Sequence, residues 1–228
     1  MNHALLVVGI EPADVRLSLQ VAGGATLLAA VAGLPLAWWL ARARFKGKAA
    51  LEAVVMAPMV LPPTVVGFYL LRLLGQGSSF GRFLDEAIGV RLVFTWQGAA
   101  IAAAVLSLPL LVRTAEAAFA EVDPEYERVA ASLGKPPWLV FLTVTLPLAA
   151  RGVAAGLALA FARAMGEFGA TVMVAGNIPG KTRTLPMSVY DAVQAGDLAR
   201  AHASAALLAA VSLASVAAVS WLVGTVRR

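Results

Sequence analysis

The sequence predicts an all-α, polytopic membrane protein in which residues 1–228 form one domain that crosses the bilayer five times. Of the 228 residues, 60% are hydrophobic and only 14% are charged, and the mean hydropathy is +0.81. A soluble domain carries about 25% charged residues, so this chain lacks the polar surface that a water-soluble fold needs. Five apolar stretches are long enough to cover roughly 30 Å of hydrocarbon as helices. We place the spans at about residues 17–41, 51–75, 93–113, 150–175 and 201–226.

The first span is predicted to be a retained helix rather than a secretory signal. A signal peptide has a basic start and an apolar core of about 7–15 residues. Here the start contains Glu11 and Asp14, and the uncharged run over residues 17–41 is far longer.

The second span is interrupted by Pro62 and Pro63. Two consecutive prolines remove two helix hydrogen bonds, and in lipid the freed carbonyl groups need other partners. Broken helices often line solute sites near the middle of the bilayer, and Thr64 adds a hydroxyl at this point. The break therefore indicates either part of a translocation pathway or a kink that serves packing.

The third span begins with the small residues of segment 98–104, which favour close contact between helices. The fifth span, residues 201–226, contains His202 as its one ionisable residue. Neither span predicts chemistry of its own.

The fourth span carries two charges in its interior, Arg163 and Glu167. Residues four apart lie on one face of a helix, where their side chains meet. A charge at the centre of a spanning helix costs about 2.5–3.5 kcal/mol on insertion scales, so we expect the two to pair and to face the bundle interior. The pair is either a pathway element for a charged solute or a structural ion pair that fixes helix packing.

Orientation follows from the cations between the first and second spans, because short loops rich in Lys and Arg stay in the cytoplasm. These cations are Arg42, Arg44, Lys46 and Lys48. The N-terminus is then outside and the C-terminus cytoplasmic. Segments 75–91 and 176–200 are expected to be external loops.

The longest predicted cytoplasmic segment, residues 113–151, contains a capped helix. Asp123 and Pro124 form an N-cap followed by proline at the first helical position, and Gly134 ends the helix, which predicts a helix over 124–133. A second helix over 138–144 should stop near Leu146 and Pro147. A loop that only connects two spans would be shorter. A rigid two-helix insert indicates a docking surface, with a surface cover for the headgroups as the alternative.

At these residues the sequence resembles a known family. Residues 127–134 (ERVAASLG), nine further residues up to 143, and residues 144–147 (VTLP) are similar to the cytoplasmic E-A-A-x3-G-x9-I-x-L-P loop of ABC-importer permeases. Arg128 stands where the family has glutamate, and Glu127 lies one residue earlier. The resemblance implies a coupling loop at about 121–147 that docks on a separate ATPase subunit. Its implied contact residues are Glu127, Arg128, Ala130, Gly134, Leu146 and Pro147.

Within this family the chain is most similar to the molybdate permeases and, in part, to the sulfate permeases. The similarity rests on segments 161–171 and 176–186, supported by 61–67 and 94–99. It implies a homodimer in the bacterial inner membrane, two ABC ATPase subunits that hold ATP and magnesium, and an extracytoplasmic molybdate-binding protein. Sulfate, tungstate and thiosulfate stay open as substrates. The candidate pathway residues are Pro62, Pro63, Thr64, Arg163 and Glu167.

Other classes of function are disfavoured by residue content. The chain has no cysteine, and its two histidines, His3 and His202, lie near the two ends of the chain, so we expect no catalytic residues, no metal ligands and no cofactor bound by this chain. Segment 176–182 (GNIPGKT) is one residue short of a nucleotide-binding P-loop, contains Pro179 and follows no predicted strand. The net charge of +5 is explained by topology and partner contact, without nucleic acid. An ATP-independent secondary anion carrier remains the rival, although it would not require a docking helix.

Overall fold

The computed structural model describes residues 11–225, and these residues form helices joined by turns, with no strand among them. The helices are α2 (Pro12–Arg42), α3 (Lys48–Val60), α4 (Pro63–Leu74), α5 (Ser79–Ile88), α6 (Trp96–Ala120), α7 (Pro124–Ser132), α8 (Pro137–Val140), the π-helix η1 (Phe141–Thr145), α9 (Leu146–Leu148), α10 (Ala150–Met165), α11 (Gly169–Ala175), α12 (Leu185–Gln194) and α13 (Leu198–Thr225).

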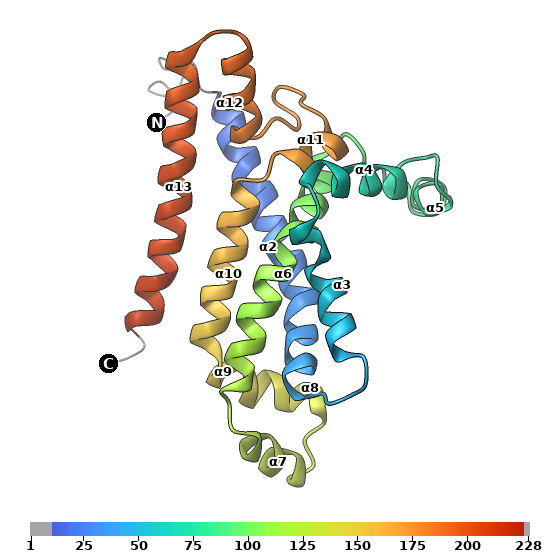
Figure 1. The fold of residues 1–228 in the computed structure, drawn as a ribbon, viewed down its shortest axis with the longest axis vertical. Helices are drawn as coiled ribbons and strands as arrows, with labels where there is room; N and C mark the ends of the chain where they lie inside the picture. Colours follow the sequence, from blue (N-terminus) through green and yellow to red (C-terminus); the bar gives the residue numbers. More distant parts are fainter. Residues whose placement is uncertain (1–10, 226–228) are drawn as a thin grey trace.

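Helices α2, α6 and α10 form the centre of the bundle, with α13 on one side and α3 on the other (Figure 1). Small side chains allow this packing: Ala25 of α2 and Ala99 and Ala103 of α6 are fully buried in one cluster. A Cβ added at Gly24 would lie 3.3 Å from the Cβ of Ala100. The close helix contacts expected from segment 98–104 are therefore confirmed.

Among residues 11–225, three helices are long and apolar enough to cross a membrane by themselves, namely α2, α6 and α13 over Leu198–Ala218. Two bent helix pairs raise the number of candidate spans in the described residues to five. The all-α, membrane-spanning fold class expected from the sequence is confirmed. The predicted positions of the two chain ends rest on residues 1–10 and 226–228, which lie outside the described residues.

The segment expected as a second span, residues 51–75, is two helices instead of one. Helices α3 and α4 meet at an angle of 105°, with Leu61 and Pro62 between them. Pro62 and Pro63 cannot donate backbone hydrogen bonds into the helix, and their rings exclude the preceding turn. The break therefore lies where the proline pair predicted it.

The segment expected as a fourth span, residues 150–175, is also broken. Helix α10 ends at Met165 and α11 begins at Gly169, so Glu167 lies after the helix that carries Arg163. This corrects the expectation that both residues share one helical face. The bent pair that reaches membrane-spanning length is instead Pro137–Leu148 with α10, at 85°.

Two helices were not anticipated, because segments 75–91 and 176–200 were expected to be loops. Helix α5 is capped by the Ser78 hydroxyl, which accepts a hydrogen bond at 2.8 Å from the N–H of Gly81, and it projects from the bundle beyond α4 (Figure 1). Helix α12 lies at the opposite end of the bundle from α7. We call these two ends the α7 end and the α12 end.

Candidate coupling loop and translocation site

Helix α7 is the capped helix that the sequence predicted over 124–133, and the structure confirms it over Pro124–Ser132. The Asp123 carboxylate accepts a hydrogen bond at 2.9 Å from the N–H of Glu125, and Pro124 opens the first turn, where its missing N–H costs nothing. Gly134 follows the helix at φ +80°, a conformation that favours glycine. Both ends of α7 are thus fixed by local chemistry.

The apolar side chains of this region face outward. Tyr126, Val129 and Leu133 are 59%, 53% and 77% exposed, whereas Ala130 is buried within the chain. A group of exposed apolar side chains on a polar helix is typical of an interaction surface. The chain itself leaves this surface uncovered, and the structure places Ala130, expected on the docking face, on the inner face.

Glu127 points into the chain and accepts hydrogen bonds from two other elements. Arg42, in the last turn of α2, donates from Nε to Oε2 at 3.0 Å and from Nη2 to Oε1 at 3.1 Å. Trp38 Nε1 of α2 and Thr145 Oγ1 of η1 donate to Oε1 at 3.2 and 2.7 Å. Glu127 therefore joins α7 to α2 and to η1 at once.

The ionised form of Glu127 is favoured by this setting. Burial tends to raise the pKa of its carboxyl, but the hydrogen bonds from Arg42, Thr145 and Trp38 and the charge of Arg42 outweigh burial and lower that pKa. Arg128, the neighbouring candidate, is exposed and pairs at 2.9 Å with Glu125, also exposed. Arg128 is thus the outward-facing charge of the two, and Glu127 is the inward-facing one.

The end of the candidate coupling loop differs from the sequence expectation. The helix expected to stop near Leu146 and Pro147 runs on through Leu148. Residues Phe141–Thr145 adopt a π-helix, in which the N–H of Leu146 bonds to the carbonyl of Phe141. This wider winding gives room for Pro147, whose ring would clash in a regular α-helix.

The two helix breaks lie against each other. A Cβ added at Gly169, the first residue of α11, would lie 3.0 Å from the Cβ of Pro63 and 3.3 Å from the Cγ2 of Thr64. One turn further on, a Cβ at Gly67 would lie 2.7 Å from the Cα of Ala170. The tertiary structure therefore brings the break at Pro63 and Thr64 against the start of α11. Pro62, Pro63 and Thr64 are exposed on the surface of the single chain.

Arg163 and Glu167 do pair, with Nη1 and Oε2 separated by 2.7 Å. Glu167 is almost fully buried, and its Oε1 also accepts a hydrogen bond at 2.8 Å from the N–H of Ala170 in the first turn of α11. The Arg163 side chain is 35% exposed. Glu167 thus holds the break in place, and Arg163 is the member of the pair that solvent or solute can reach.

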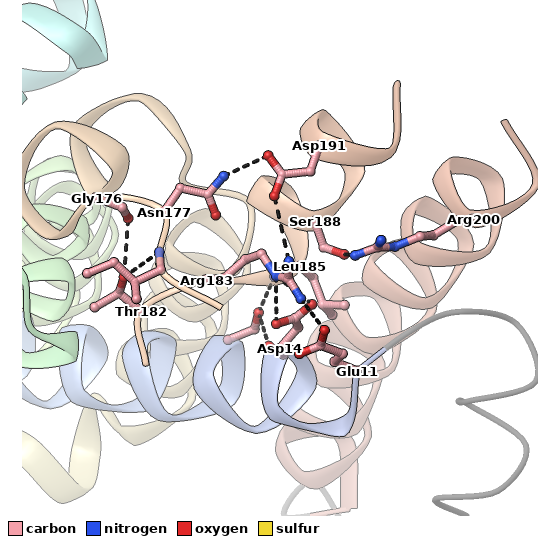
Figure 2. Close-up of polar contacts among 12 residues, drawn as sticks. Glu11, Asp14, Gly176, Asn177, Thr182, Arg183, Leu185, Ser188, Asp191 and Arg200 are labelled. Carbon is pink, nitrogen blue, oxygen red and sulfur yellow. Dashed lines mark hydrogen bonds and ion pairs between the residues drawn. The ribbon is translucent and has the colours of Figure 1, made fainter. Parts of the chain in front are cut away.

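A second ion-pair cluster at the α12 end was missed by sequence reasoning (Figure 2). Arg183 Nε lies 3.1 Å from both carboxylate oxygens of Asp14, and Arg183 Nη2 lies 2.8 Å from Glu11 Oε1. Oδ2 of Asp191, in α12, lies 3.8 Å from Nη1 of Arg183. Arg183 and Asp14 are both buried, and they join α2 to the turn that precedes α12.

Sequence signals for this cluster existed but were assigned elsewhere. Asp14 lies before the first predicted span, and Arg183 lies in segment 176–186, which resembles molybdate permeases; no local spacing links the two. The P-loop-like segment 176–182 follows helix α11, and its Thr182 hydroxyl accepts a hydrogen bond at 3.1 Å from the N–H of Ile178. That segment is a closed turn rather than a phosphate cradle.

Comparison with known families gives the class of protein. The sequence of residues 33–228 matches the protein family described as the inner membrane component of binding-protein-dependent transport systems. The chain belongs to this family. The resemblance to importer permeases noted in the sequence is thus confirmed, and so are the membrane location and the non-enzymatic character of the subunit.

Curated permeases of this family cover most of the chain. The molybdenum transport system permease ModB of Escherichia coli K12 is 46% identical over 180 residues, which are 79% of each chain. ModB of Haemophilus influenzae is 39% identical over 214 residues, 93% of each chain. The sulfate transport system permease CysT of E. coli is 37% identical over 87% of this chain and 71% of its own.

Solved permease structures share the fold. A structure of the MetNI methionine ABC transporter in inward-facing conformations has a TM-score of 0.70 at 18% identity and covers 94% of this chain and 95% of its own. A bacterial ABC transporter that imports alginate has a TM-score of 0.72 at 16% identity and covers 95% of this chain and 79% of its own. The chain thus has the fold of ABC-importer membrane subunits.

Proposed function

We propose that this permease is the membrane-spanning subunit of an ATP-driven importer that carries molybdate into the cytoplasm. The observation that carries this proposal is the identity of 39–46% to molybdenum permeases over most of the chain, combined with a capped α7 whose apolar side chains are uncovered. In this proposal the α7 end is cytoplasmic, as the cations of segment 42–48 indicate, and the N-terminus is outside.

The coupling loop, residues 121–147, is the proposed docking site for the ATPase. Tyr126, Val129 and Leu133 supply the apolar contact, and Arg128 supplies the outward charge. ATP and magnesium belong to that partner, and two ATPase subunits serve two permease copies. Gly134, Leu146 and Pro147 shape the loop rather than contact the ATPase.

The proposed pathway runs along the two abutting helix breaks. Pro62, Pro63 and Thr64 are exposed on the surface of one chain, so a second copy of the permease is needed to enclose them. Arg163 is the cation that an oxyanion would meet, because its side chain is partly exposed. Glu167 is buried, and its carboxylate already accepts a hydrogen bond from the N–H of Ala170. An extracytoplasmic binding protein would deliver the anion at the α12 end.

The test is uptake by the permease reconstituted in liposomes with its ATPase and its binding protein. Molybdate uptake should require ATP, the ATPase and the binding protein together. Uptake without ATP would identify a secondary carrier and overturn the proposal.

The substrate is tested separately, because identity to CysT favours sulfate as the second candidate. Calorimetry of the binding protein with molybdate, tungstate, sulfate and thiosulfate ranks the anions. Tighter binding of sulfate than of molybdate would replace the proposed substrate while leaving the importer mechanism standing.

A further inference from the structure

Helix α2 is fixed at both of its ends to the parts of the chain that a transport cycle must coordinate. At the α7 end, Arg42 and Trp38 donate hydrogen bonds to Glu127 of the coupling helix. At the α12 end, Asp14 pairs with Arg183, which precedes α12. One helix of 31 residues thus touches both the coupling loop and the turn at the opposite end.

The contact at the α12 end has a second, neutral component. The hydroxyl of Ser18 accepts a hydrogen bond at 2.7 Å from the N–H of Leu185, the first residue of α12, and donates to the carbonyl of Asp14 at 2.8 Å. Ser18 is buried, as are Asp14 and Arg183. The first turns of α2 and the start of α12 are therefore joined by the Asp14–Arg183 ion pair (Figure 2) and by the hydrogen bond from the N–H of Leu185 to the Ser18 hydroxyl.

Between its ends, α2 is packed rather than free. A helix of this length extends about 46 Å at about 1.5 Å per residue. Buried residues of α2 lie in three apolar clusters with α6, from Val21 through Ala29 to Leu40. A Cβ added at Gly33 would lie 3.1 Å from Cδ1 of Leu108 in α6, so α2 packs closely against α6 at Gly33 as well. Packed interiors transmit displacement instead of absorbing it.

Both end contacts resist separation for the same physical reason. Taking one partner from a buried ion pair leaves an uncompensated charge, which is costly in a low-dielectric setting. Asp14 and Arg183 are buried, and Arg42 and Glu127 are at most 21% exposed. Each end of α2 therefore moves with the segment that it contacts, α7 at one end and the turn that precedes α12 at the other.

We propose that α2 is a strut that carries movement of the coupling helix directly to the turn of residues 176–184 at the α12 end, with Glu127 and Arg183 as its positioning residues. This inference rests on the proposed coupling to an ATPase and adds a route to it. Closure of the ATPases moves α7, α2 follows through Glu127, and the turn that faces the arriving solute follows through Arg183. Neither residue contacts the solute.

The absence of cysteine from the sequence allows a direct test. Lys181 is exposed in the turn two residues before Arg183. The Lys181→Cys permease, assembled with its ATPase in lipid nanodiscs, is labelled with a hydrophilic maleimide with and without magnesium and a non-hydrolysable ATP analogue. We expect nucleotide to change the labelling rate. Glu127→Gln and Arg183→Gln should each abolish that change while the ATPase still co-purifies.

Matched controls separate the strut from general damage. Glu86→Gln makes the same chemical change at an exposed site on α5, outside the coupling loop, and Arg91→Gln removes an exposed cation beyond α5; both should keep the nucleotide effect. If Glu127→Gln fails to fold, Arg42→Lys retains the cation but loses the two-point contact, and it should weaken the effect. If Arg183→Gln fails to fold, the double variant Asp14→Asn with Arg183→Gln leaves no buried charge without its partner, and it should abolish the effect.

The outcomes distinguish the strut from the function on which it rests. A nucleotide effect that survives both Glu127→Gln and Arg183→Gln overturns the strut, as does ATP-driven uptake by a wild-type permease in which nucleotide leaves the labelling rate unchanged. Failure of wild-type uptake itself, with ATPase and binding protein present, overturns the proposed function and the strut with it.

Discussion

Arg42 and Glu127, 85 positions apart in the sequence, form a two-point ion pair that fastens the end of α2 to the coupling helix. Trp38 and Thr145 complete the set of donors around the same carboxylate. Because Glu127 is turned inward by these contacts, the charges that α7 presents on its outer surface are those of Arg128 and Glu125.

The lowered pKa of Glu127 predicts an acid-sensitive attachment of α7. A carboxyl whose pKa is lower in the folded state stabilises that state above its unfolded pKa, and the gain is lost as pH falls through the folded pKa. We expect the wild-type advantage over Glu127→Gln, on the order of 1–3 kcal/mol, to be constant from neutral pH to about 4.5 and to shrink below it. Thermal unfolding in detergent across this pH range measures it. An advantage that grows on acidification would contradict the ion pair.

Gly67 should tolerate no larger residue. The Cβ of Gly67→Ala would lie 2.7 Å from the backbone of Ala170, so α4 and α11 must separate at a cost of about 1–3 kcal/mol. Reduced thermal stability and reduced uptake are expected together. Gly23→Ala on α2, where a Cβ meets nothing within 4 Å, is the matched control and should leave both unchanged. Equal behaviour of the two variants would argue against close packing at the helix breaks.

Arg183→Gln should be among the most destabilising single changes in the described residues. It leaves Asp14 buried without its cation, and breaking a buried pair costs roughly 3–5 kcal/mol. Asp14→Asn combined with Arg183→Gln removes both charges and should recover part of the loss. Unfolding titrations of Arg183→Gln, Asp14→Asn and the double variant provide the cycle. Additive losses in the double variant would mean that the two residues do not act as a pair.

Arg163→Gln should impair transport more than stability, because the Arg163 side chain is partly exposed beside the proposed pathway. We expect uptake of the oxyanion to fall on the order of tenfold, which corresponds to about 1.4 kcal/mol. Glu167→Ala should instead lower stability by about 1 kcal/mol, since it removes the buried hydrogen bond that the N–H of Ala170 donates to Glu167. Uptake and unfolding measured on both variants separate the roles. Unimpaired uptake by Arg163→Gln would assign the pair to packing alone.

Several features were predictable because their causes are local. The hydropathy of residues 17–41 and 93–113 predicted helices that the structure contains as α2 and α6, and the caps at Asp123 and Gly134 predicted α7. The position of the break at Pro62 follows from the missing N–H of proline. Its angle does not, because bending depends on what the two halves pack against.

The fourth predicted span shows where local reasoning was insufficient. The spacing of Arg163 and Glu167 fits a continuous helix, and the two do pair, yet α10 ends at Met165 with Gly166 as its C-cap, so Glu167 lies beyond it and bonds to the N–H of Ala170 in α11. Spacing of four permits the contact both within a helix and across a tight break. Hydropathy cannot distinguish these cases, because both bury the same residues.

The sequence by itself determined that this chain is a membrane protein, how many apolar segments it has and where a capped helix lies between them. These features are local, because hydropathy, proline and helix caps act between residues that are near neighbours in the sequence. The tertiary structure alone decided which distant charges meet. Arg42 reaches Glu127, and Asp14 reaches Arg183, only after α2 has packed along α6. Those pairings depend on the free energy of the whole bundle, so no local pattern encodes them.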